Sequence, residues 1–124
     1  MNKRDITILR KIIEEAAALA HMLHGIEELT FLVNDEKMRA VCMTLINIGE
    51  LIKNLDDDFR QEHSQVPWKK MAGFRDVASH GYFTLRMPDV WLYAFTEMPA
   101  YATEIRMILD KEVDMEQRRV LNNG

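Results

Sequence analysis

The amino-acid sequence predicts an all-α fold, a bundle of four main helices that run up and down beside one another. Apolar residues recur at three- and four-residue spacing along most of the chain, and no segment shows the strict alternation of a strand. No internal repeat or linker interrupts this pattern, and 124 residues are enough for one domain rather than two. We therefore expect residues 1–124 to form a single helical domain.

The first two predicted helices have recognisable ends. Asp5 is expected to open the first helix, and Gly25 to end it or bend it. The second begins after Asn34, because asparagine is a good N-cap residue, and runs to about Leu55. Its apolar surface is wider than one seam, which favours a central position in the bundle and allows contact with a second copy in a homodimer. The acidic run at residues 56–58 is interpreted as a solvated helix junction.

The third and fourth predicted helices carry the remaining apolar stripes. The third runs from Trp68 through His80 and stops at Gly81. Pro88 opens the fourth, since proline is tolerated in the first turn of a helix. Pro99 lies inside the same apolar pattern, so a bend in the preceding turn is expected rather than two separate helices.

The composition excludes a membrane span and a disulfide. Polar residues interrupt every apolar stretch well short of the roughly 20 residues that a membrane helix needs. The charged N-terminal segment lacks the apolar core of a secretory signal. Cys42 is the single cysteine, and its place in an apolar helical pattern indicates a small buried hydrophobe rather than a nucleophile. We predict a cytoplasmic protein that does not contact a membrane.

The most informative segment is the run Arg75-Asp76-Val77-Ala78-Ser79-His80-Gly81-Tyr82. Arginine presents a planar fork of donors that fits phosphate oxygens, and histidine changes its charge near neutral pH. On an ideal helix Asp76 and His80 are adjacent, so the carboxylate would hold one ring nitrogen. Arg75 and His80 are about 140° apart around that helix and would need a distorted helix end, or a second copy across a symmetric interface.

Two interpretations of this run remain open. It suggests phosphodiester chemistry without a metal ion, because a phosphate-binding cation and a proton-exchanging imidazole lie within two helical turns. The same residues would also serve as ordinary capping and surface charge at a helix end, and spacing alone favours that simpler interpretation.

Further short segments accompany the run in a fixed order: Ile48-Gly49-Glu50, Val66-Pro67-Trp68, Ala72-Gly73-Phe74-Arg75-Asp76, His80-Gly81-Tyr82-Phe83, Trp91 and Pro99. With the motif Arg-x4-His-x-Tyr, they make nearly the whole chain resemble the HEPN superfamily, and specifically the HepT-like toxins of prokaryotic toxin-antitoxin pairs. The motif alone is short and would occur by chance, but its order and helical setting make the combination more specific.

The resemblance implies a HEPN-like domain and a metal-independent endoribonuclease that cleaves single-stranded RNA as a homodimer. Arg75 would bind the scissile phosphate and stabilise its developing charge, and His80 would act as general acid or base. Asp76 matches the polar position after the arginine and is included in the catalytic set. The RNA 2′-hydroxyl would attack and leave a cyclic phosphate, so no metal and no cofactor is implied.

The resemblance also implies a partner, a minimal nucleotidyltransferase antitoxin that transfers AMP to the motif tyrosine. Tyr82 is the matching position, and attached AMP would occupy and neutralise the site. The simpler role of Tyr82 is aromatic packing beside Phe83 at a helix end. The rival function is a non-catalytic helical adaptor that binds a nucleotide or a nucleotidyltransferase.

The charge distribution is a partial check on this prediction. The formal net charge of −4 is not typical of a strong general nucleic-acid binder. The segment around the motif, however, contains one acidic residue, Asp76, and four basic residues: Lys69, Lys70, Arg75 and Arg86. We therefore expect weak, salt-sensitive RNA binding that is concentrated at the motif.

Overall fold

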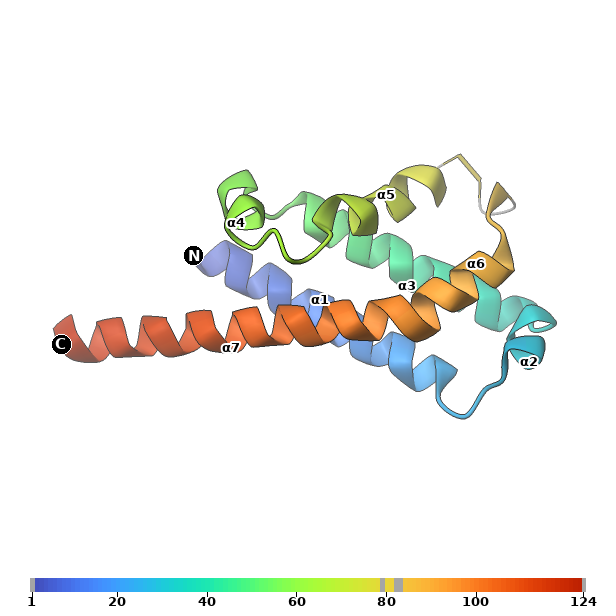
Figure 1. The fold of residues 1–124 in the computed structure, drawn as a ribbon, viewed down its shortest axis with the longest axis horizontal. Coiled ribbons are helices and arrows are strands. Elements are labelled where there is room, and N and C mark those ends of the chain that lie inside the picture. The colour runs from blue at the N-terminus through green and yellow to red at the C-terminus, as the bar shows by residue number, and fades with distance from the viewer. Residues whose placement is uncertain (1, 79, 82–83, 124) are drawn as a thin grey trace.

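The structure is a computed structural model that describes residues 2–78, 80–81 and 84–123, and these residues form helices and turns with no strand (Figure 1). The elements are α1 (Lys3–Leu23), α2 (Glu28–Leu32), α3 (Asp35–Lys53), α4 (Asp57–Glu62), α5 (Trp68–Ala78), α6 (Met87–Leu92), the π-helical turn η2 (Tyr93–Glu97) and α7 (Met98–Asn123). The predicted all-α class is confirmed.

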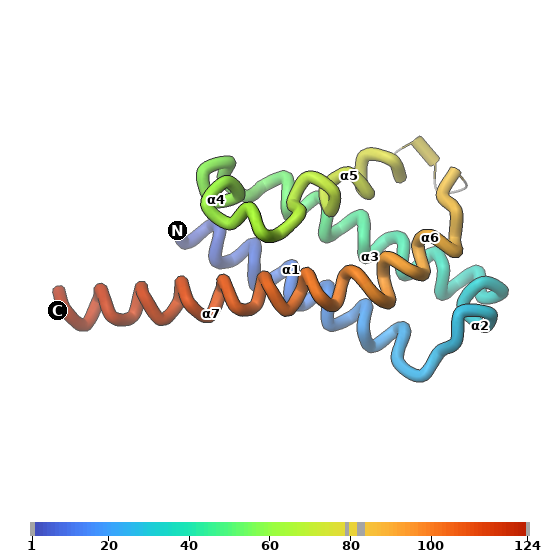
Figure 2. The backbone as a smooth tube through the Cα atoms, viewed as in Figure 1, coloured from blue at the N-terminus to red at the C-terminus, as the bar shows by residue number. Residues whose placement is uncertain are grey.

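Four long segments make up the bundle, as the tube in Figure 2 shows. The central one is α3, which packs against α1 on one side and α5 on another. The fourth segment consists of α6, η2 and α7, and it packs mainly on α1. Two short helices, α2 and α4, are missing from the sequence prediction because five or six residues are too few to show a periodic pattern. Within the described ranges, no helix is long and apolar enough to cross a bilayer.

The first helix begins earlier than predicted. Asn2 is its N-cap and accepts a hydrogen bond from the backbone N–H of Asp5 at 2.7 Å, so the expectation that Asp5 opens the helix is wrong. Asp5 is instead buried in the first turn, where its carboxylate accepts the backbone N–H of Asp56 at 3.2 Å. Burial raises the pKa of Asp5. The acidic run that begins at Asp56 is therefore the start of α4, tied to α1, and Gly25 (φ 71°) follows the end of α1.

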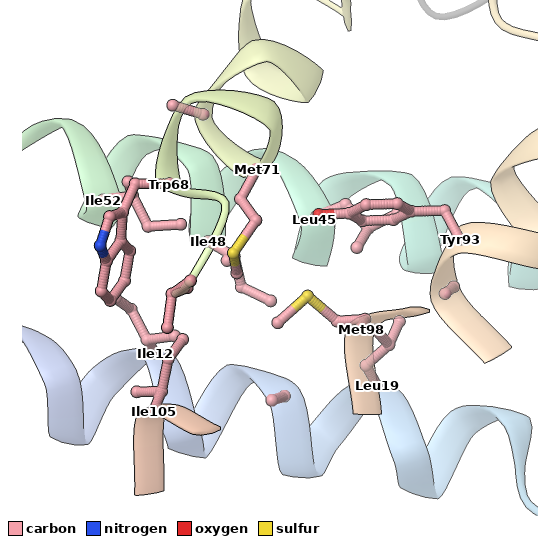
Figure 3. Packing of buried hydrophobic residues seen from close by; sticks show 14 of the residues in the cluster. Ile12, Leu19, Leu45, Ile48, Ile52, Trp68, Met71, Tyr93, Met98 and Ile105 are labelled. Atoms are coloured by element: carbon pink, nitrogen blue, oxygen red, sulfur yellow. The ribbon is translucent and has the colours of Figure 1, made fainter. Parts of the chain in front are cut away.

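The core is one contiguous cluster to which all four segments contribute. Figure 3 shows Trp68 and Met71 of α5 extending into the core between α3 and α1, where Met98 and Ile105 of the last helix also lie. The indole Nε1–H of Trp68 donates to the backbone carbonyl of His63 at 2.9 Å, which satisfies its polar atom. Cys42 is 1% exposed and burial raises its pKa to about 11, so the prediction of an inert buried thiol is confirmed.

The last segment stays helical from Met87 to Asn123, with a π turn in the middle. The backbone N–H of Met98 donates to the carbonyl of Tyr93, a five-residue spacing in place of the usual four. Pro99 follows directly, and its ring and missing N–H disturb the preceding turn. The expectation of one distorted helix rather than two is confirmed, and the distortion is a wider turn.

Candidate functional site

The Arg75-Asp76 pair lies on the last turns of α5 and is held by two residues of α3. The guanidinium Nε–H of Arg75 donates to Glu50 Oε2 at 2.6 Å, and Nη1 lies 3.5 Å from Asp76 Oδ1. The ammonium of Lys53 binds the same Asp76 oxygen. These four residues form an alternating row of charges, which we call the α3–α5 charge cluster, and their side chains are between 37% and 53% exposed.

A glycine explains why α3 and α5 approach closely enough for these ion pairs. A Cβ atom at Gly49 would lie 2.8 Å from the Cβ of Arg75 and 3.2 Å from the backbone carbonyl of Met71. Backbone atoms of a packed helix cannot move aside cheaply, so any larger residue would push the two helices apart. Gly49 thus sets the spacing at which its neighbour Glu50 reaches Arg75.

The charge cluster fixes the protonation state of its aspartate. The hydrogen bond from Lys53 lowers the pKa of Asp76 below its usual value. Asp76 is therefore a carboxylate at neutral pH and cannot act there as a proton donor. Arg75 has five N–H donors, and among the described residues Glu50 and Asp76 engage two of them, so further N–H groups can donate to an anion.

His80 does not lie on the helix that was predicted to carry it. The described part of α5 reaches Ala78 and His80 lies in a turn, so the prediction that the helix includes His80 is wrong. The backbone N–H groups of His80 and Gly81 donate to the carbonyls of Val77 and Ala78 at 3.1 and 3.0 Å, which forms a turn after the helix. Gly81 has φ 131°, a conformation that favours glycine.

The turn at His80 affects the predicted contact between the Asp76 carboxylate and the His80 ring. The predicted adjacency of Asp76 and His80 assumed a continuous helix, whereas the imidazole lies exposed in the turn beyond it. Asp76 forms ion pairs with Lys53 and Arg75, among its other contacts. Tyr82, the predicted modification site, lies outside the described residues.

Two surface grooves flank α5. The first has a volume of about 660 Å³ and lies between the end of α3, α4 and α5. We call it the basic groove, and the charged residues that line it are Lys53, Asp57, Arg60, Lys69 and Asp76. The second has a volume of about 530 Å³ and lies between α5 and the segment from Thr84 to η2. We call it the aromatic groove, and it is lined by Phe74 and Tyr93, which stack with ring centroids 6.1 Å apart.

The cations predicted to surround the motif do not form one patch. Lys69 lines the basic groove, whereas Lys70 and Arg86 line the aromatic groove. The ammonium of Lys70 binds Glu97, which raises the pKa of the lysine, and Arg86 lies 3.8 Å from Asp89. The structure thus brings together Arg75 and Asp76, but places the neighbouring basic residues on two sides of α5.

Glu50 and Lys53 are the site residues that sequence reasoning missed. They lie three residues apart on α3, a spacing that puts two side chains on one helix face. That spacing alone does not show which face of α3 meets α5, so it does not predict that Glu50 and Lys53 contact Arg75 and Asp76. Among the described residues, no group of three or more histidine, cysteine, aspartate or glutamate side chains is placed to hold a metal ion.

Comparison with known proteins gives the family. A family model described as ribonuclease HepT-like matches residues 12–108. The chain belongs to the HepT-like ribonuclease family. The match confirms the resemblance found in the sequence and, at the level of the family, the predicted enzyme class of an endoribonuclease.

Several relatives of this HepT-like protein support the assignment. A candidate RNase of Caldanaerobacter subterraneus subsp. tengcongensis is 36% identical over 104 residues, which cover 84% of this chain and 93% of the relative. A candidate RNase of Methanocaldococcus jannaschii is 32% identical over 94% of this chain and 96% of the relative. A probable ribonuclease HepT of Thermococcus cleftensis is 33% identical over 66% of this chain and 81% of the relative. No solved structure matches the chain significantly.

Proposed function

We propose that this HepT-like protein is a metal-independent endoribonuclease that cleaves single-stranded RNA through the RNA 2′-hydroxyl. The observation that carries the proposal is the guanidinium of Arg75, oriented by Glu50, on the helix that leads into the turn holding His80. The family assignment supports RNA as the substrate.

The proposed reaction is a transesterification at phosphorus. The 2′-oxygen attacks, the bond from phosphorus to the 5′-oxygen breaks, and the products carry a 2′,3′-cyclic phosphate and a 5′-hydroxyl. His80 accepts the proton of the 2′-hydroxyl or donates a proton to the leaving 5′-oxygen. Arg75 donates N–H groups to the phosphate oxygens, where negative charge grows in the transition state. Because the nucleophile belongs to the RNA, the reaction needs no metal-activated water.

Asp76 has a supporting role in this proposal. Its carboxylate, kept ionised by Lys53, faces the guanidinium of Arg75 and limits the directions in which that side chain can turn. Glu50 does the same from the other side through Nε. Holding a cation in position before the substrate arrives lowers the reorganisation that the reaction would otherwise require.

The test of the catalytic proposal uses single-stranded RNA in the presence of a chelator. Wild-type protein is expected to produce cyclic-phosphate ends, and an all-deoxy strand of the same sequence is expected to resist cleavage. Arg75→Ala and His80→Ala are each expected to lower the rate by about 100-fold or more. Cleavage that persists unchanged in His80→Ala contradicts the assignment, and nucleotide binding without any cleavage favours the adaptor function instead.

We also propose that two copies share one cleft. The α3–α5 charge cluster and His80 are exposed, so a second copy can approach them, and the resemblance implies that both subunits supply an arginine and a histidine. Mixing inactive Arg75→Ala and His80→Ala proteins tests this arrangement, because a mixed dimer regains one intact set. Restored cleavage supports the shared cleft, and a monomer by analytical ultracentrifugation at the assay concentration argues against it.

Regulation by an antitoxin extends the same proposal. We infer that the protein is the toxin of a cytoplasmic toxin-antitoxin pair and that a minimal nucleotidyltransferase transfers AMP to Tyr82. The two other tyrosines are poor acceptors, because Tyr93 is buried and the hydroxyl of Tyr101 donates to Glu97 at 3.2 Å. AMP at Tyr82, which belongs to the same sequence motif as Arg75, would add negative charge and compete with the RNA phosphate.

Mass spectrometry after coexpression with the adjacent gene tests this step. An AMP-sized addition on the peptide that contains Tyr82, together with loss of cleavage, is the expected result. Tyr82→Phe is expected to stay active and to escape inhibition by the antitoxin. A modification confined to Tyr93 or Tyr101 contradicts the placement.

A further inference from the structure

Two lysines that are neighbours in the sequence lie on opposite sides of α5. Lys69 lines the basic groove, which also contains Asp76 of the charge cluster. Lys70 lines the aromatic groove, where its ammonium binds Glu97. The two lysines therefore line different grooves, although they are adjacent in the sequence.

The basic groove has one cation more than it has carboxylates. Within it, Lys53 binds Asp76 and Arg60 binds Asp57. Lys69 is exposed, and among the described residues no carboxylate lies within ion-pair distance of its ammonium. The charged side chains that line the groove therefore sum to a net positive charge, in a chain whose overall formal charge is −4.

The groove borders on Arg75 through one shared neighbour. Asp76 lines the groove and also contacts Arg75, so a strand with one phosphate at Arg75 passes the edge of the groove. Lys69 precedes Arg75 by six residues, which corresponds to about 9 Å along the helix axis. A neighbouring phosphate of the same strand can reach Lys69 over such a distance.

We propose that the basic groove holds the RNA strand on one side of the cleavage point, with Lys69 and Arg60 contacting backbone phosphates, while Lys70 takes no part in RNA binding. This inference rests on the proposed ribonuclease function and adds the path of the substrate to it. The aromatic side chain beside this groove, Trp68, is 5% exposed and leaves no free ring face for a base. The groove is thus expected to bind the sugar-phosphate backbone with little sequence preference on this side.

The test compares Lys69→Ala with Lys70→Ala in a His80→Ala background, so that the RNA stays intact. Each change removes one positive charge from adjacent positions, which makes the pair a matched control for net charge. Affinity for a single-stranded RNA is measured by fluorescence anisotropy over a series of salt concentrations. Lys69→Ala is expected to weaken binding several-fold at low salt and to reduce the slope of log K against log salt by about 0.7. Lys70→Ala is expected to leave the slope unchanged.

A second pair tests Arg60. Arg60→Ala removes a groove cation and the ion pair with Asp57, whereas Asp57→Ala breaks the same ion pair and keeps the cation. The proposal predicts weaker RNA binding for Arg60→Ala and equal or tighter binding for Asp57→Ala. Equal losses in both variants would mean that the ion pair, and not the cation, matters, and that result overturns the role of Arg60.

The outcomes separate this inference from the proposed function. Equal effects of Lys69→Ala and Lys70→Ala, or no effect of Lys69→Ala, overturn the groove assignment even where the wild-type protein cleaves RNA. Binding that depends on Lys69 in a protein that never cleaves supports the groove and counts against the catalytic proposal. Thermal unfolding of each variant confirms that a loss of affinity does not come from a loss of folded protein.

Discussion

At the scale of single residues, the contact between Glu50 and Arg75 is the one that shapes the site most. An ion pair between half-exposed side chains contributes little to folding, about 0–1 kcal/mol. Its effect is on direction, because Glu50 binds the Nε–H and so orients the outer N–H groups of the guanidinium, one of which also contacts Asp76. A residue that never touches the RNA can in this way decide how well Arg75 binds it.

Substitution of Glu50 is therefore expected to affect cleavage more than stability. Glu50→Ala should lower kcat/KM by about 10- to 100-fold, because a misplaced guanidinium no longer meets the phosphate. Glu50→Gln keeps an acceptor oxygen for the Nε–H and should lose less. Single-turnover cleavage and thermal unfolding of the same preparations measure the two effects. An Ala variant that cleaves as fast as wild type would show that Arg75 needs no such partner.

The pH dependence of cleavage tests the ionisation state of Asp76. Because Lys53 lowers the pKa of Asp76, this carboxylate stays ionised at and above its usual value of 3.8 and is neutralised only as the pH falls below it. An ionisation seen near neutral pH in the rate profile should then not come from Asp76. Asp76→Asn is expected to lower the rate and to leave the position of that ionisation in place. Its disappearance in Asp76→Asn would contradict this assignment.

At the scale of helices, the close contact of α3 with α5 depends on a single missing side chain. Gly49 lies where a Cβ would meet backbone atoms of α5, whereas nothing lies within 4 Å of a Cβ at Gly73. Glycine to alanine normally favours a helix by about 1 kcal/mol. Substitution by alanine is therefore expected to lower the stability of the protein at Gly49 but not at Gly73.

Gly49→Ala is expected to destabilise the protein by about 1–3 kcal/mol and to lower cleavage, because α5 must move away from Glu50. Gly73→Ala is expected to leave stability unchanged or to raise it by up to about 1 kcal/mol. Urea unfolding gives both values, and cleavage assays on folded protein give the second effect. Similar stabilities for the two variants would show that α5 can shift without cost.

The sequence predicts features that depend on neighbouring residues, such as helix caps, but not contacts between residues that are far apart in the chain. The cap at Asn34 and the proline at the start of α6 are read from neighbouring residues, and both are observed. The end of α5 differs because His80 and Gly81 close a turn by hydrogen bonds that spacing does not reveal. The pairing of Glu50 with Arg75 spans 25 positions and depends on how two helices dock, so no pattern within either helix predicts it.

At the scale of the whole molecule, the last helix divides into a packed part and a free part. Its end, red in Figure 1, extends past the other helices, and the side chains of residues 117–123 are exposed.

The packed part of the helix has a buried face and an exposed face. Ile105 is fully buried against α1, while Met107, two residues away, is 61% exposed. The packed part of the last helix thus has one face in the core, which contributes to stability, and one face exposed to solvent.

Two alanine substitutions test the difference between the buried and the exposed face of the last helix. Ile105→Ala is expected to cost about 2–5 kcal/mol of unfolding free energy, because it leaves a cavity among close-packed side chains. Met107→Ala removes a side chain of similar size from the surface and should change stability by less than about 0.5 kcal/mol. Denaturant unfolding measures both. A large loss for Met107→Ala would indicate that this face is covered in solution, as a second copy would cover it.

The π turn at Tyr93–Glu97 has a consequence for how the chain tolerates changes in length. Such a turn contains one residue more than an α-helical turn at the same place, so removing one residue there restores regular spacing and keeps both flanking helices facing the core. A deletion in the middle of α3 has no such remedy, because every later side chain rotates by about 100° away from its packing partner. Shortened versions of this protein should therefore be sought at η2, where a lost residue leaves the register of α6 and α7 intact.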